Sequence, residues 1–304
     1  MKTRKLLTIA AGAIAASLAV SAQAQTDISF EFSGVPGPYN NFETLAPTDV
    51  AGVSPAANWN VVDINQFTNY NSLSLETDTL TSGVVDSNGA PSVLGASLTS
   101  YGTEDQKYAG DSIAGTAGVL LNSGGMTNGA GGVYPTPATL TISGLNSGDN
   151  YEFFVYTSGQ PYGTAYASLG LAGVGTQYFQ TAQGSATGFQ TNSTTSDLMD
   201  GVYTAGAYNY LIPYTYESNY VEFSGVTGLS SADFTLTELG SYPNGCWCPA
   251  GYNSGNNHGN ALVGIAGIQV VDLSAAVPEP GTIWSAALGL IGLVGFQMRR
   301  SRKS

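Results

Sequence analysis

The alternation of apolar and polar residues in the middle of the chain is typical of short β-strands. Residues 139–142 and 234–237 alternate strictly, which predicts strands with one face buried and one face in water. Residues 151–156 are largely apolar on both faces and predict a central strand. No helical periodicity between residues 25 and 276 extends far enough to predict a convincing helix. Strand patterns occur at 27–32, 138–143, 151–157, 175–181, 219–223, 233–239 and 265–273.

Residues that favour turns separate these strand patterns. Gly, Asn, Asp and Ser gather at 144–149, 86–89 and 124–132, and Gly and Asn tolerate the left-handed backbone that sharp reversals need. Many short strands joined by such turns predict one all-β domain over residues 25–276, a jelly-roll or lectin-like β-sandwich. Residues 182–207 are rich in Gly, Ser and Thr and predict a long loop.

The N-terminal segment has the pattern of a secretory signal peptide. Three basic residues lie within the first five positions, and an apolar run follows over residues 6–20. Ala22 and Ala24 occupy the −3 and −1 positions of a cut before Gln25. The alternative is a first transmembrane helix, but the run is short for a bilayer and rich in weakly hydrophobic alanine. We therefore expect residues 1–24 to be removed by signal peptidase.

The C-terminal segment has the pattern of a membrane tether. Uncharged, mostly apolar residues fill positions 282–298, which is the lower limit for a spanning helix. Four basic residues within 299–303 follow, as the positive-inside rule requires. A buried helix of the globular domain is the alternative, but it would leave these cations without solvent. The sequence therefore predicts a transmembrane helix that leaves the preceding domain outside the cell.

The tripeptide Pro278-Glu279-Pro280, the apolar helix and the basic end together resemble the PEP-CTERM sorting signal of Gram-negative bacteria. The resemblance implies a sorting motif at Val277, Pro278, Glu279 and Pro280 that an exosortase recognises. It also implies cleavage near this motif and release or attachment at the cell surface, often in organisms that make exopolysaccharide. The expected organisation is a signal peptide over 1–24, a secreted domain over 25–276 and a sorting signal over 277–304.

Stretches of the predicted domain also resemble a group of secreted PEP-CTERM proteins. Residues 51–60, AGVSPAANWN, resemble an element near the start of that group, and residues 219–225 with 265–271 resemble its closing strands. Residues 241–260 form an insertion longer than this pattern needs. The group is similar in layout to lectin-like β-sandwiches, so the resemblance implies a fold and no activity.

The charge distribution separates the two ends from the domain. The chain has 8 basic and 21 acidic residues, a net charge of −13. Seven of the bases lie in the two ends, so residues 25–276 hold Lys107 against 20 acids, a net charge of −19. This sign excludes a nucleic-acid binder and disfavours anionic polymers such as uronic-acid chains. It favours neutral sugars or divalent metals. Calcium suits an acidic domain, although no D-x-D-x-D-G loop identifies its ligands.

The insertion holds the only cysteines and histidine of the chain: Cys246, Cys248 and His258. Two cysteines of an exported protein usually form a disulfide, but a bridge across one intervening residue is strained. Two thiolates and an imidazole could also bind copper or zinc, although three ligands leave the metal shell open. A local or intermolecular disulfide, unpaired thiols and a metal site therefore remain three alternatives, with the disulfide favoured.

The sequence gives little support for catalysis. Nucleophilic catalysis of the Ser–His–Asp or Cys–His type needs an imidazole, and His258 lies in a Gly/Asn loop. Glycoside hydrolysis needs two carboxylates at a set separation, but no sequence feature selects a pair among 20 acids. We therefore assign no catalytic residue.

Sugar binding suits the composition better. Aromatic rings stack on sugars, which makes Trp59, Trp247 and the tyrosine-rich stretch 203–220 candidate glycan contacts. The expected function is a non-catalytic, exosortase-sorted protein of the cell surface or extracellular matrix that contacts glycans such as exopolysaccharide. A secreted carbohydrate-active hydrolase and a self-assembling matrix component are the alternatives.

Overall fold

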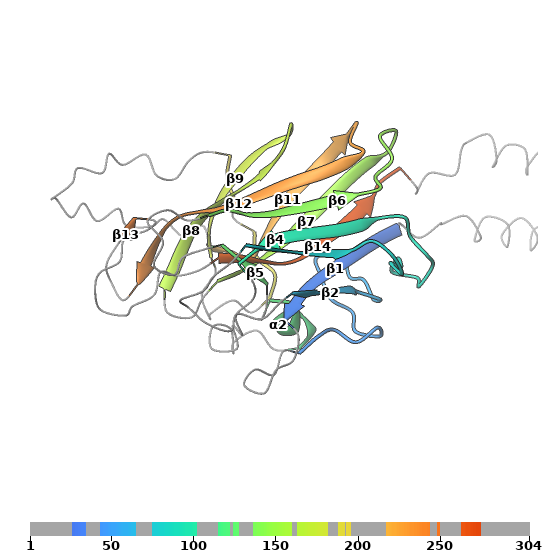
Figure 1. Ribbon diagram of the computed structural model, residues 1–304, viewed down its shortest axis with the longest axis horizontal. Helices are drawn as coiled ribbons and strands as arrows, with labels where there is room; N and C mark the ends of the chain where they lie inside the picture. The colour runs from blue at the N-terminus through green and yellow to red at the C-terminus, as the bar shows by residue number, and fades with distance from the viewer. Residues whose placement is uncertain are drawn as a thin grey trace, which may run out of the picture. The chain divides into compact units, whose positions relative to one another are not determined.

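The computed structural model describes twelve stretches of the chain: residues 26–34, 43–64, 75–101, 115–121, 124–127, 136–159, 163–181, 188–191, 193–195, 217–243, 248–249 and 263–274 (Figure 1). The chain divides into two compact units. One is Thr26–Val271, and the other combines Met1–Gln25 with Asp272–Ser304. The first unit contains all the sheet structure discussed below.

Two β-sheets make up the described part of Thr26–Val271. Sheet 1 has the strand order β11 (Tyr220–Thr227), β7 (Asn150–Gly159), β14 (Val263–Asp272), β1 (Thr26–Gly34) and β2 (Asn60–Ile64), with β5 (Gly125–Met126) paired to β14. Sheet 2 has the order β10 (Glu217–Ser218), β9 (Gly175–Thr181), β8 (Gly163–Leu171), β12 (Ser231–Pro243), β6 (Ala138–Ser143), β4 (Gly95–Ser100) and β3 (Glu76–Leu80), with β13 (Cys248–Pro249) paired to β12. One short helix, α2 (Thr116–Leu121), lies within the described residues.

The hydrophobic core lies between the two sheets. Alternate residues of the longer strands supply most of it, as the two-residue period of a β-strand requires. Phe234 of sheet 2 joins the layers, because its ring meets those of Phe153 and Phe223 of sheet 1 at 5.4 and 5.8 Å between centroids. Such edge-on and tilted aromatic pairs add to the stabilisation from buried area. The fold is therefore mostly β, with two sheets in a sandwich-like arrangement.

The strongest strand predictions are confirmed. Strands β6 and β9 coincide with residues 138–143 and 175–181. Strand β7 is central, with β11 on one side and β14 on the other, and nearly all of its side chains are buried or half-buried as predicted. The alternation of Thr139–Ile142 also appears directly in the structure, because β6 buries every second residue. Strong periodicity and apolar composition therefore located the strands that fill the core.

Strands β2, β3, β4 and β8 were not predicted, nor were the two-residue strands β5, β10 and β13, of which β5 lies in the expected turn region 124–132. Strands β3, β4 and β8 carry the sequences ETDTL, GASLTS and GTAYASLGL, in which Gly, Ser, Thr or acidic residues weaken the apolar signal. Such residues are typical of turns, yet Thr is also a good strand residue when its side chain faces water. Pairing with neighbouring strands determines these elements more than their own composition does.

Two of the predicted turns are confirmed. In 86–89 the Gly89 amide donates to the Asp86 carbonyl at 2.9 Å, and Gly89 has a φ of 80°. In 144–149 the Asp149 amide donates to the Asn146 carbonyl at 3.0 Å. Asx-type bonds from backbone amides to the side chains of Asp86 and Asn146 support both turns.

Within the described residues, no helix is long and apolar enough to cross a membrane. The predicted signal peptide over 1–24 and the predicted helix over 282–298 lie outside those residues. So does most of the predicted loop over 182–207.

Candidate functional site

Most of the residues that the sequence proposed for a site lie outside the described part of the chain. These are Val277, Pro278, Glu279, Pro280, Cys246, Trp247 and His258. Cys248 lies in β13, where its backbone pairs with Ser241 of β12. The disulfide, free-thiol and metal alternatives therefore remain predictions. Among the described residues, no group of three or more His, Cys, Asp or Glu side chains is placed to hold a metal ion.

Trp59 is described, and it is a packing residue. Its side chain is only 5% exposed, and its ring meets the Tyr156 ring edge-on at 5.9 Å between centroids. The indole Nε1 donates to the carbonyl of Ala56 at 3.0 Å. A buried ring offers no free face for stacking on a sugar. The structure therefore corrects the expectation that Trp59 contacts a glycan.

The motif around Trp59 forms a strap, which we define as residues 51–58, across the face of sheet 1 that is turned away from the core. The strap closes on itself through backbone bonds between Ala51 and Ala56 at 3.0 and 3.1 Å. The Val53 amide donates to the Tyr156 hydroxyl at 2.7 Å, and the Ser54 carbonyl accepts from Gln269 Nε2 at 2.7 Å. The AGVSPAANWN motif thus has a structural role here.

Gln269 of β14 is the centre of this network. Its side chain is fully buried, and its Nε2 also donates to Ser29 Oγ at 3.2 Å. Its Oε1 accepts from the Ser54 amide at 3.3 Å and from the Tyr156 hydroxyl. Gly52 has a φ of 95°, and a Cβ at this position would overlap the Gln269 carboxamide. Only glycine fits at position 52, because any side chain would be both strained and blocked.

Carboxylates of the same face lie close to the strap. The Ser54 hydroxyl donates to Asp27, which partly opposes the effect of burial in raising the pKa of that carboxyl. Burial raises the pKa of Glu31 to about 7, although the Leu45 amide donates to its Oε2 at 3.0 Å. Buried carboxyl groups without cationic partners favour the protonated form.

Glu152 and Glu222 lie on the neighbouring strands β7 and β11 of this face. Desolvation and then the charge of Glu222 raise the pKa of Glu152. The two acidic side chains therefore lie close enough to affect each other's ionisation.

Glu238 is a functional candidate that the sequence did not reveal. It lies on β12 beside Ala167 of β8, on the strand face that also points Phe234 and Leu236 into the core. It is 2% exposed, and neither carboxyl oxygen has a hydrogen-bond partner among the residues that the structure describes. Burial raises the pKa of Glu238 to about 8. Glu238 follows Phe234 and Leu236 at intervals of two residues along the strand, and this spacing could have identified it as an inward-facing residue.

The outer face of sheet 2 carries rows of side-chain hydroxyls. In the first row the strand registers align Thr77, Thr99, Thr139, Thr235, Gly170 and Thr176, which belong in turn to β3, β4, β6, β12, β8 and β9. A second row aligns Thr79, Ser97, Thr141 and Asp233. We call these two rows the hydroxyl face. On the central strands β6, β12 and β8 the chain neighbours of these residues belong to the core, so the side chains of the rows face outward.

Some hydroxyls of this face bond to each other. The Oγ1 atoms of Thr77 and Thr99 lie 2.8 Å apart. The Thr141 hydroxyl donates to Asp233 at 2.7 Å. Over the described residues, the side-chain hydroxyls of Thr139, Thr235 and Thr176 make no intramolecular hydrogen bond. The free hydroxyls therefore gather at the end of the first row that contains Gly170.

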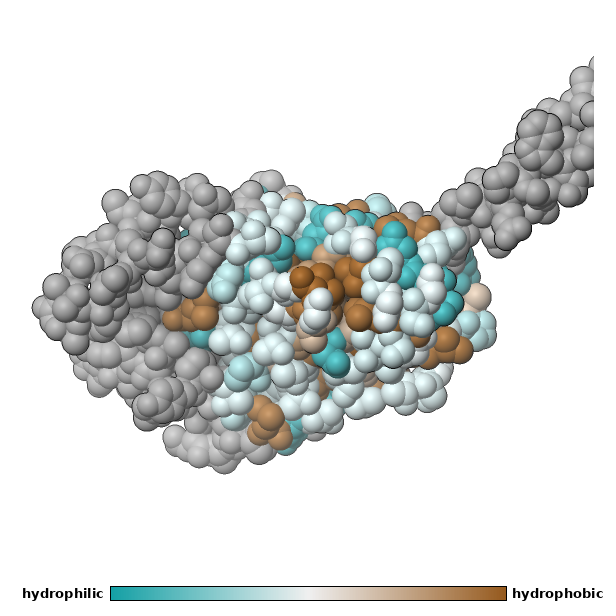
Figure 2. All heavy atoms as spheres, turned by 90° about the horizontal axis from the view of Figure 1, so that it is seen from above, coloured by the Kyte–Doolittle hydropathy of each residue, from teal (hydrophilic) through white to brown (hydrophobic). Residues whose placement is uncertain are grey.

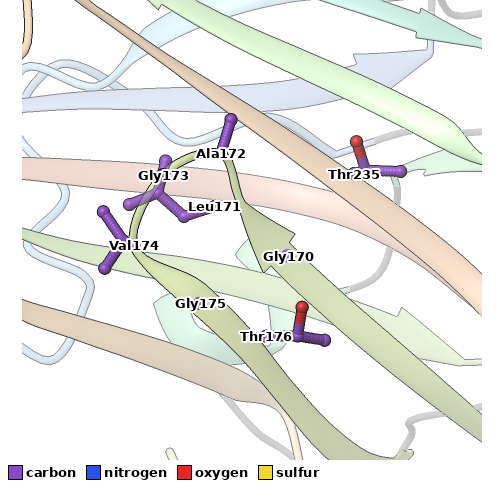
Figure 3. Close-up of a pocket in the computed structure, with 8 residues that line it drawn as sticks. All are labelled: Gly170, Leu171, Ala172, Gly173, Val174, Gly175, Thr176 and Thr235. Carbon is purple, nitrogen blue, oxygen red and sulfur yellow. The ribbon is translucent and has the colours of Figure 1, made fainter.

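An open depression of about 470 Å³ lies at this end of the hydroxyl face (Figure 3). Gly170 lies between Thr235 and Thr176 in the row, and the β8–β9 turn closes one end of the depression with Ala172, Gly173 and Val174. The depression exists because Gly170 contributes no side chain to a row in which its aligned neighbours are threonines. Its volume falls within the range of small-molecule sites in proteins.

Large hydrophobic side chains do not gather on the described surface. Those that stand exposed are Val50, Leu75, Val93 and Val174, which belong to separate segments. On the face shown in Figure 2, brown hydrophobic residues form small patches among pale and teal ones. The described surface therefore presents no broad apolar area of the kind that stable protein interfaces use.

Comparison with known families gives one finding, and it concerns the C-terminal end. Residues 276–300 match the family model of the PEP-CTERM protein-sorting motif. No curated protein and no solved structure matches the chain. The motif implies processing by an exosortase and export to the cell envelope or surface of a Gram-negative bacterium. The chain therefore carries a PEP-CTERM protein-sorting motif, and the resemblance seen in Pro278-Glu279-Pro280 is confirmed.

Proposed function

We propose that the protein is a non-catalytic component of the bacterial surface or extracellular matrix that binds glycans through its β-sandwich. The observation that carries the proposal is the sorting motif at residues 276–300, because it implies export to the cell envelope or surface. In the proposal, signal peptidase removes residues 1–24 and the helix over 282–298 holds the chain in the membrane until exosortase acts. The sandwich then serves as a lectin-like module.

The non-catalytic part of the proposal draws support from the described carboxylates. Glu31 and Glu238 are buried, so neither carboxyl group is open to a substrate. The acidic character of residues 25–276 supports a neutral glycan as the partner, because anionic polymers would be repelled.

The sorting step can be tested in a producing strain. We expect the wild-type chain to appear at the surface in a processed form about three kilodaltons smaller than the signal-peptide-free precursor, since roughly 28 residues are removed. A strain without exosortase, or a variant with Glu279→Ala, should retain the unprocessed chain in the inner membrane. Fractionation and mass spectrometry measure both. Unchanged processing in both backgrounds would overturn the sorting proposal.

A further inference from the structure

We propose that the hydroxyl face of sheet 2 binds a linear neutral polysaccharide and that one sugar ring occupies the depression over Gly170. The inference rests on the proposed glycan-binding function and assigns it a site. The chain of the polysaccharide crosses the strands along the first row, from Thr139 to Thr176.

The chemistry of the face matches that of a sugar polymer. Each threonine offers a hydroxyl that both donates and accepts, together with a methyl group. A neutral sugar offers the same combination of hydroxyls and apolar C–H groups. Because neighbouring strands lie about 4.8 Å apart, the first row presents these groups at a regular interval across the sheet. A polymer with a repeated unit can therefore make the same contact several times.

The free hydroxyls determine where on the face binding is strongest. Thr77 and Thr99 bond to each other and Thr141 donates to Asp233, so part of the hydrogen-bonding capacity of these hydroxyls is already used. The hydroxyls of Thr139 and Thr235 have no such partner within the described part of the chain. A ligand gains hydrogen bonds at these positions without breaking any in the protein.

Gly170 supplies room for a sugar ring beside these hydroxyls. A Cβ at Gly170 would lie 3.3 Å from Thr176 Oγ1 and 4.0 Å from the Thr235 carbonyl oxygen, so even a methyl group would reduce the space between them. The depression of about 470 Å³ is open along the row. A ring seated on the backbone at Gly170 therefore reaches threonine side chains on both sides.

The electrostatics select a neutral polymer. The hydroxyl face carries one charged group, Asp233, whose carboxylate accepts from Thr141. Residues 25–276 carry a net charge of −19, so an anionic polysaccharide is repelled. The right-handed twist of a β-sheet also turns each strand relative to the next. A flexible chain can follow this twist, whereas a flat crystalline surface cannot.

The test replaces hydroxyls without changing side-chain shape. In the double variant Thr139→Val and Thr235→Val, valine keeps the branched shape and the strand preference of threonine. Thr227→Val is the matched control, because Thr227 is an exposed strand threonine of sheet 1. Gly170→Ala is a second variant that fills part of the depression. The full-length protein and each variant are titrated with dextran, laminarin, xyloglucan and alginate, and circular dichroism confirms that each is folded.

We expect the wild type and Thr227→Val to bind at least one neutral polysaccharide and not alginate. The double variant should bind roughly tenfold or more weakly, since two hydrogen bonds are lost, and Gly170→Ala should also weaken binding. Neutral-polysaccharide binding that both face variants leave unchanged overturns this site but leaves the proposed function standing. Failure of the wild type to bind any neutral polysaccharide overturns both, while the sorting step keeps its own separate test.

Discussion

Replacing Glu238 by Gln should remove much of the pH dependence of stability. In the folded protein burial raises the pKa of Glu238 to about 8, whereas the unfolded chain has the ordinary value of 4.5. Between these values the folded state holds a proton that the unfolded state has lost. Stability therefore falls as the pH rises from about 4.5 to 8 and is level above that range.

The size of the effect follows from the interval between the two pKa values. At about 1.4 kcal/mol for each pKa unit, this interval lowers the free energy of unfolding by roughly 5 kcal/mol if the protein interior does not rearrange. This value is an upper limit, because a carboxylate that ionises inside a protein draws in water or rearranges its surroundings. Gln has nearly the same shape and stays neutral at every pH. The Glu238→Gln variant should equal the wild type at pH 4.5 and exceed its stability by about 2–5 kcal/mol at pH 9.

Urea unfolding at pH 4.5, 7 and 9 measures this difference as a change in the midpoint at constant slope. Glu43→Gln is the control, because Glu43 is exposed and the same change of charge there should leave the pH dependence intact. Part of the pH dependence should remain in the Glu238→Gln variant, since burial also raises the pKa of Glu31 to about 7. If wild type and Glu238→Gln lose stability in parallel from pH 4.5 to 9, Glu238 is not the unpartnered buried acid described above.

Three further predictions concern packing and the strap, and urea unfolding measures each of them. Gly52→Ala should lower the free energy of unfolding by about 2–4 kcal/mol, because of backbone strain and overlap with Gln269. The control Gly83→Ala should lower it by only about 1 kcal/mol, because its φ is also positive but nothing lies within 4 Å of the added Cβ. Equal losses would contradict the role given to the overlap. Gln269→Leu should lower the free energy of unfolding by about 3 kcal/mol, because it leaves the buried Tyr156 hydroxyl without its acceptor. Unchanged stability would show that the network adds none. Phe234→Ala should cost about 3–5 kcal/mol through the cavity it leaves between the sheets, and a loss below 1 kcal/mol would argue against the described core.

The parts of the fold that periodicity predicted are those that fill the core. Strand β7 was evident because its residues are apolar on both faces, and β6 because every second residue is apolar. The hydroxyl face could not be predicted in the same way. Its rows depend on the register between strands such as β3 and β4. Residues in adjacent positions of a row lie 18 to 96 positions apart in the sequence, apart from the six between Gly170 and Thr176.

Single residues show the same limit for the candidate site. Trp59 suggested a sugar platform, because composition alone does not show that the strap buries its ring against Tyr156. Glu238 resembled an ordinary solvated acid, although its spacing from Leu236 placed it on the inward face. In both cases the burial of a side chain depends on which segments cover it, and that information is tertiary.

The position of β14 has a consequence for the order of events during export. In sheet 1 the last strand of the body lies between β7 and the first strand, β1, so it joins the N-terminal pair β1–β2 to the pair β7–β11. A chain that leaves the cell from its N-terminus delivers β14 last. On the proposed export route, sheet 1 therefore closes only after almost the whole body has crossed the membrane.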